Sequence, residues 1–189
     1  FYTPSHLAQL LIDEIMPLSD YDKIDFQAYK ILDPACGSGI FLVLAFKRLV
    51  QWWRLKQSNF SSKPNLKDLK MLMNCIYGVD KEEQATKLAA FSLCLALCDE
   101  LSPLQIITEL HFEDLTQKNI LYSDFFIKEY SEAEELYQTS EFQKQLSNYK
   151  KIDGYCFDLI IGNPPFRRSG SLKGVKAAFW NTKIKNEAV

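Results

Sequence analysis

Apolar residues along this chain fall into short runs that end in polar residues, and longer helical stretches separate these runs. The runs at residues 30–32, 75–80, 119–126 and 157–161 have the length and apolar content of buried strands. Residues 40–53 are strongly helical in composition, and the stretch after residue 80 predicts a second helix with a face of small residues. Strands that alternate with helices predict a doubly wound α/β domain with a mostly parallel sheet.

The segments outside these elements have weaker patterns. Thr3 is suited to cap a helix and Pro4 to occupy its first position. Large apolar residues follow at helical spacing, namely Leu7, Leu10, Leu11 and Ile15. Residues 56–70 are rich in Ser, Asn and Lys and predict a surface loop or a lengthened crossover. Residues 128–151 are charged and amphipathic and predict one or two surface helices, with Leu136, Phe142, Leu146 and Tyr149 facing inward.

Two turns at the ends of predicted strands have the composition of a binding site. Asp33-Pro34-Ala35-Cys36-Gly37-Ser38-Gly39 joins a strand to a helix, and its glycines allow a ligand to approach the backbone closely. The loop lacks the third glycine of the dinucleotide fingerprint and the Lys of a P-loop. Asp33 places a carboxylate beside the loop, which favours a cationic ligand over a diphosphate.

The second turn is Gly162-Asn163-Pro164-Pro165-Phe166. Neither proline has an N–H, and Pro165 restricts Pro164 to an extended conformation. The turn therefore presents carbonyl oxygens and the Asn163 side chain in a nearly fixed arrangement. Asn163 and the Pro164 carbonyl can each accept one N–H, and Phe166 offers a face on which a base can stack. Such a turn suits a planar group that carries an NH2.

Together these motifs resemble those of S-adenosylmethionine-dependent methyltransferases, above all the adenine-N6 DNA methyltransferases. The resemblance assigns catalytic roles to Asn163, Pro164, Pro165 and Phe166. It assigns cofactor binding to Tyr2, Thr3 and Pro4 at the methionine end, to Asp33, Ala35, Cys36, Gly37 and Gly39 in the loop, to Asp80 on the ribose, and to Asp124 and Phe125 on the adenine. Cys36 is interpreted as a small packed side chain rather than a nucleophile, because no Pro-Cys pair is present.

The motif order, with Tyr-Thr-Pro first and Asn-Pro-Pro-Phe last, is similar to the gamma arrangement of these enzymes. The resemblance implies a Rossmann-like class I methyltransferase domain that is truncated after its fourth motif strand and lacks a target-recognition domain. In this interpretation residues 1–29 are an N-terminal helical segment, residues 30–166 the cofactor-binding and catalytic core, and residues 167–189 a basic tail. The implied substrate is double-stranded DNA with a flipped adenine. Type I modification subunits and fused type IIG enzymes both fit, with specificity or restriction subunits as possible partners.

Charge and cysteine content limit the other possibilities. From Arg167 onward there are six basic residues and one acidic residue, so the total of −2 leaves −7 on residues 1–166. An acidic body does not by itself bind duplex DNA, so most DNA contacts are expected elsewhere. The five cysteines mostly lie in apolar runs and only two histidines are present, which predicts a reducing cytoplasm and no metal site. No apolar run is long enough to span a membrane.

Two alternatives stay open at the level of sequence. The same turn would grip the amide of a protein glutamine or the amine of an RNA base, although the Tyr-Thr-Pro start and the Asp33–Gly39 loop favour DNA adenine. The chain could also be a cofactor-binding unit without activity of its own.

Overall fold

The structure is a computed structural model, and it describes residues 3–57, 61–127 and 139–164. The remaining residues include Tyr2, Pro165, Phe166, Leu136 and the basic tail, so the predictions for these lie outside the described residues. The elements in chain order are α1 (Ser5–Ile15), the 3-10 helix η1 (Leu18–Asp20), β1 (Ile31–Asp33), α2 (Ile40–Lys56), α3 (Leu66–Met73), β2 (Ile76–Asp80), α4 (Glu83–Cys98), α5 (Pro103–Thr108), the 3-10 helix η2 (Leu115–Gln117), β3 (Ile120–Tyr122), α7 (Ser140–Tyr149) and β4 (Leu159–Ile160).

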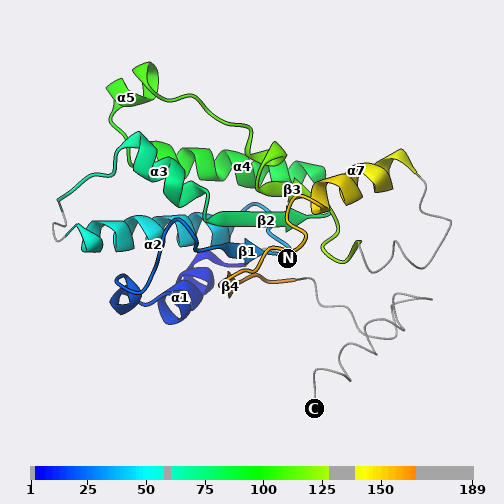
Figure 1. Cartoon of the computed structure of the whole chain (residues 1–189), viewed down its shortest axis with the longest axis horizontal. Coiled ribbons are helices and arrows are strands. Elements are labelled where there is room, and N and C mark those ends of the chain that lie inside the picture. The colour runs from blue at the N-terminus through cyan, green and yellow to red at the C-terminus, as the bar shows by residue number, and fades with distance from the viewer. Residues whose placement is uncertain (1–2, 58–60, 128–138, 165–189) are drawn as a thin grey trace, which may run out of the picture.

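The four strands form one parallel sheet in the order β3-β2-β1-β4. The chain therefore moves outward from β1 to β2 and β3, and then returns to place β4 on the other side of β1 (Figure 1). Both the α/β class and the parallel sheet confirm the prediction from the apolar runs. Asp158, the one acidic residue in the apolar run at 157–161, lies just before β4. Its carboxylate accepts the N–H of Lys30 at 2.8 Å, and this bond ties the start of β4 to the residue before β1.

Side chains that alternate along the strands belong to two clusters of buried apolar residues, one on each face of the sheet. Ile31, Ile76, Ile120 and Ile161 point to the face that α1, α2, α3 and α4 cover, and all four are buried. The opposite face carries a smaller cluster around Leu32, Val79, Leu121 and Ile152. The alternation between faces is the two-residue period of a strand, and burial on both sides accounts for the continuous apolar runs.

The first helix differs from its prediction in two ways. Pro4, not Thr3, is the N-cap, and it makes no side-chain capping bond. The large residues at helical spacing are the exposed ones, with exposed fractions of 41% to 55% for Leu7, Leu10, Leu11 and Ile15. The buried residues are Ala8, Ile12 and Met16. Spacing alone could not decide between the two faces, and the face with the small Ala8 is the one that packs against α2.

Two further predictions need correction. The helix α3 begins at Leu66 inside the segment predicted to be a loop. Its start has a full capping box, because Asn65 and Asp68 each accept the other's backbone N–H through their side chains. On α4, Leu88 is exposed, whereas Ala89, Leu93 and Ala96 pack inward as expected from the small-residue face.

Candidate active site

The strand order has a switch point between β1 and β4, and the space beyond the carboxyl ends of these two strands is called the crevice below. Successive connections run in opposite directions from β1, and ligands of open α/β sheets bind at such a switch point, beyond the carboxyl ends of the strands. The predicted site residues lie at this edge. Asp33 ends β1 and Asp80 ends β2, while Asp124 follows β3 by two residues and Asn163 follows β4 by three.

The glycine loop after β1 is tied to the end of β2. The N–H of Gly37 donates to the Asp80 carboxylate at 2.8 Å, and the N–H of Ala35 donates to the Asp33 carboxylate at 3.0 Å. A phosphate-binding loop directs such N–H groups at its ligand. Here two carboxylates accept them, so these N–H groups are not available to a phosphate.

Glycine is required at both positions of the loop that adopt a left-handed backbone. Gly37 has φ +52° and Gly39, the N-cap of α2, has φ +86°. A Cβ on Gly39 would lie 3.1 Å from the backbone of Ala89, so this glycine also allows α2 to start close to α4. A Cβ on Gly37 would meet nothing within 4 Å. The space above Gly37 is therefore open for a ligand.

Asp33 is more deeply buried than its place beside a loop suggests. It is 1% exposed, and burial raises its pKa to about 7, with a further rise from Asp80 and an opposing effect from the Ala35 N–H. Gly162 covers it, since a Cβ on Gly162 would lie 2.5 Å from the Asp33 carboxylate oxygen. Gly162 does not adopt a left-handed backbone, so the residue is needed for close approach rather than for a sharp turn.

The Cys36 side chain belongs to the core. It is 4% exposed and packs against Gly78 of β2. A Cβ added to Gly78 would lie only 3.1 Å from the Cys36 sulfur. Its N–H donates to the Val79 carbonyl and its carbonyl accepts from Gly39. Burial raises the pKa of the Cys36 thiol well above its usual value, so this residue is a poor nucleophile. The packing role predicted from the sequence agrees with this placement.

The carboxylates at the ends of β2 and β3 are held by their own turns. Asp80 also accepts the N–H of Glu82 at 2.9 Å, and Asp124 accepts the N–H of Phe126 at 3.0 Å. Each carboxylate oxygen has a second lone pair, so these bonds leave capacity for a ligand hydroxyl or amine. Phe125 is half-buried and packs edge-to-face against Tyr149, with ring centroids 6.1 Å apart.

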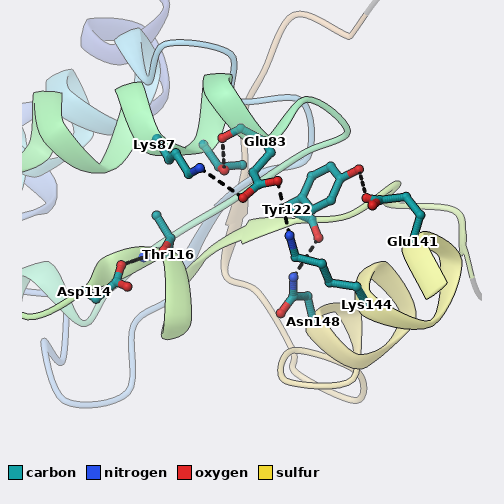
Figure 2. A network of polar contacts seen from close by, with 9 residues as sticks. Glu83, Lys87, Asp114, Thr116, Tyr122, Glu141, Lys144 and Asn148 are labelled. Carbon is teal, nitrogen blue, oxygen red and sulfur yellow. Dashed lines mark hydrogen bonds and ion pairs between the residues drawn. The ribbon is translucent and has the colours of Figure 1, made fainter.

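Helix α7, for which the sequence suggested no chemical role, anchors the Asp124 turn. Its Asn148 side chain donates to the Tyr122 carbonyl at 3.0 Å, and its Gln145 side chain donates to the Tyr122 hydroxyl at 2.8 Å and accepts the N–H of Asp124 at 3.3 Å. Lys144 of α7 pairs with Glu83 of α4 at 3.2 Å, as Figure 2 shows. These charges are exposed, so the pair adds little stability, and the network mainly positions the turn.

The sequence contained only part of the information needed to predict these contacts of α7. The sequence predicted the amphipathic helix, and Phe142, Leu146 and Tyr149 are indeed half-buried. Its polar residues contact β3, which lies some twenty residues away in the chain. Such pairings leave no local pattern, so they could not be found without the sheet.

The turn after β4 faces the start of the chain. The Asn163 side chain is exposed, and its NH2 donates to the Thr3 hydroxyl at 3.1 Å. Thr3 and Asn163 are 160 positions apart in sequence, yet the structure brings both beside the crevice. Pro164 of the same turn is also exposed.

Two hollows lie away from this crevice. One, of about 40 Å³, is formed by α3, α4 and the segment before β3, at the amino ends of the strands. The other is an open groove of about 330 Å³ between α2 and α4. Neither hollow is lined by a residue predicted for the site, although Ser38, which lies between Gly37 and Gly39 in the loop, lines the groove.

The fold and this edge define a Rossmann-like methyltransferase domain: a parallel sheet with a switch point, a glycine loop held by carboxylates, and an Asn-Pro turn beside it. The chain belongs to the Eco57I restriction-modification methylase family, whose model matches residues 74–188.

Three relatives extend this result. The type II restriction enzyme and methyltransferase RM.Eco57I of Escherichia coli is 28% identical over 181 residues, which are 87% of this chain and 17% of that protein. A putative type II restriction enzyme and methyltransferase of Methanocaldococcus jannaschii is 35% identical over 101 residues, 51% of this chain and 7% of that protein. The adenine-specific methyltransferase PglX of Streptomyces coelicolor is 31% identical over 94 residues, 50% of this chain and 7% of that protein. The chain thus spans less than a fifth of each relative.

Within residues 3–57, 61–127 and 139–164, no helix is both long enough and apolar enough to cross a lipid bilayer. The same residues include no group of three His, Cys, Asp or Glu side chains arranged to hold a metal ion.

Proposed function

We propose that this chain belongs to a DNA methyltransferase of a restriction-modification system, which moves a methyl group from S-adenosylmethionine to the exocyclic amine of adenine. The observation that carries the proposal is the position of Asn163, which follows β4 at the switch point beside the Asp33 loop. The family match and the printed names of the relatives, which combine restriction enzyme, methyltransferase and adenine specificity, support the same reaction.

The residues at the crevice fit S-adenosylmethionine. This cofactor supplies a methyl group on a positively charged sulfur. Asp80 gives the crevice negative charge of the kind that a cation prefers, and the open space above Gly37 leaves room for the ligand. Asp33 contributes less of this charge, because it is buried and its pKa is raised to about 7. We assign Asp80 to the ribose hydroxyls and Asp124 to the adenine amine, with Phe125 against the adenine ring. Cys36 can contribute little, because its side chain is in the core and its main-chain groups are already bonded.

The Asn163 turn performs the orientation step. The Asn163 side-chain oxygen and the Pro164 carbonyl accept the two N–H groups of the target amine. These bonds draw the nitrogen lone pair out of conjugation with the ring and direct it at the methyl carbon. As the N–C bond forms, the electron pair of the S–C bond stays on sulfur, and the nitrogen then loses one proton to solvent. No general base is needed before transfer. Pro165 and Phe166, proposed to stiffen the turn and to stack on the base, complete this assignment.

The substrate is double-stranded DNA with the target adenine flipped out of the helix, since the amine is otherwise paired and stacked. The acidic body leaves most DNA contacts to other parts of the protein or to partner subunits. The names of two relatives combine a restriction enzyme and a methyltransferase, which favours the fused type IIG arrangement over a type I modification subunit. The five cysteines, which mostly lie in apolar runs, favour a reducing cytoplasm as the place of the reaction.

The reaction can be tested directly with the natural full-length protein. It is incubated with methyl-tritiated S-adenosylmethionine and unmethylated mixed-sequence duplex DNA, and the DNA is digested to nucleosides. The proposal predicts label in N6-methyladenine at one sequence context. Parallel reactions with RNA and with a glutamine-containing protein serve as controls. Label in either of these, in a methylated cytosine, or in no product would refute the assignment.

A further inference from the structure

We propose that Thr3 is a positioning residue that orients the Asn163 side chain for the methyl transfer. The inference rests on the proposed function, and it gives Thr3 a role toward the target amine in addition to the cofactor contact expected from its motif. The observation is the hydrogen bond in which the Asn163 NH2 donates to the Thr3 hydroxyl at 3.1 Å.

The orientation of an asparagine side chain matters at this site because its two ends have opposite polarity. The oxygen accepts hydrogen bonds and the NH2 donates them. A target amine must donate, so it can be gripped only by the oxygen. Asn163 is exposed, and an exposed side chain of this kind can rotate to present either end. The bond to Thr3 occupies the NH2 and leaves the oxygen without a hydrogen-bond partner among the described residues.

Thr3 can serve this role because its own position is fixed by the core. It precedes α1, whose Ala8, Ile12 and Met16 are fully buried. The guanidinium of Arg48 on α2 donates to the carbonyl of Met16 and to the carboxylate of Asp13. Helix α1 is therefore held firmly on α2, and the start of α1 is carried to the β4 turn as part of that unit.

The Thr3 hydroxyl also has a proton of its own. When the oxygen accepts from Asn163, that proton is directed elsewhere, and an anionic group is the best acceptor for it. A group that accepts this proton would keep the Thr3 oxygen turned toward the Asn163 NH2. Thr3 thereby links the start of the chain to the catalytic turn.

Two substitutions separate the hydroxyl from the shape of the side chain. Thr3→Val keeps the branched shape and loses the hydroxyl, whereas Thr3→Ser keeps the hydroxyl and loses the methyl group. In the full-length protein, Thr3→Val should lower kcat for DNA methylation by roughly three- to tenfold, the effect of one neutral hydrogen bond. Because Thr3 is also expected to contact the cofactor, kcat is measured at saturating S-adenosylmethionine, so that a weaker affinity for the cofactor does not contribute to the loss. Thr3→Ser should keep most of the wild-type kcat.

Thr108→Val is the matched control, because Thr108 ends α5, which Figure 1 shows well away from β4. It should leave kcat unchanged. Wild-type kcat in Thr3→Val would overturn the inference. Weakened cofactor binding by Thr3→Val, with normal kcat at saturating cofactor, would also overturn it, since Thr3 would then act on the cofactor alone. A loss of kcat in Thr3→Ser equal to that in Thr3→Val would overturn it as well, because the packing of the side chain, and not its hydroxyl, would then be what matters. Failure of the proposed function would look different, because the wild-type protein would then not methylate DNA.

Discussion

Replacing Gly37 with alanine separates the stability of the glycine loop from its role in binding. Gly37 has φ +52°, and an alanine Cβ there would meet no protein atom within 4 Å. The left-handed backbone is therefore the main source of strain, and its cost for a residue with a Cβ is about 1 to 2 kcal/mol. The added methyl group would point into the space assigned to the cofactor, where forcing it against a ligand costs about 1 to 3 kcal/mol.

Gly154 provides the matched control for this experiment. It has φ +82°, again with no atom within 4 Å of an added Cβ, and it lies in the turn before β4. Gly37→Ala and Gly154→Ala should lower the free energy of unfolding by a similar amount in urea denaturation. Calorimetric titration with S-adenosylmethionine should show affinity lowered by roughly five- to 150-fold in Gly37→Ala alone. Equal affinities for wild type and Gly37→Ala, in a folded protein, would show that the cofactor does not lie on this loop.

Two further predictions concern the same edge of the sheet. Burial raises the pKa of Asp33 from 3.8 to about 7, so the stability it contributes is complete below pH 4 and is lost as the pH rises to about 7. The free energy of unfolding of Asp33→Asn should therefore rise relative to that of wild type over this pH range, by up to about 4 kcal/mol. If denaturant unfolding gave the two proteins the same dependence of this free energy on pH, the burial of the Asp33 carboxylate would be refuted. Gly39→Ala should cost more stability than Gly154→Ala, by about 1 to 3 kcal/mol, because its Cβ would lie 3.1 Å from Ala89; equal losses in the two variants would show that α2 and α4 do not approach so closely here.

The sequence predicted the sheet because strand signals are local. Each strand is a short apolar run, and the polar residue that ends it lies at the carboxyl edge by the rule for parallel strands. The resemblance assigned Asp33, Asp80, Asp124 and Asn163 to cofactor binding and catalysis, and in the structure each of them ends or closely follows a strand at this edge. Three of the four predicted strands are longer than the observed ones, because an apolar run continues past the residues that pair in the sheet.

The features that the sequence missed depend on residues distant in the chain. The burial of Asp33 requires Gly162, which follows 129 positions later, and no local pattern reports this. The bond between Thr3 and Asn163 has the same character. The start of α3 is a different kind of error, because the Asn65–Asp68 capping box is a local pattern in the sequence, whereas the polar composition of the same segment indicates a loop.

The central claim is that Asn163 grips the target amine beside the bound cofactor. Single-turnover methylation by the full-length Asn163→Ala protein, measured together with its affinity for S-adenosylmethionine, tests this claim most directly. The account predicts that methyl transfer falls on the order of 10²- to 10³-fold, as for the loss of one transition-state hydrogen bond, while the dissociation constant for the cofactor changes by no more than a few fold. Near-normal transfer by Asn163→Ala, or a loss that arises entirely from weaker cofactor binding, would contradict it.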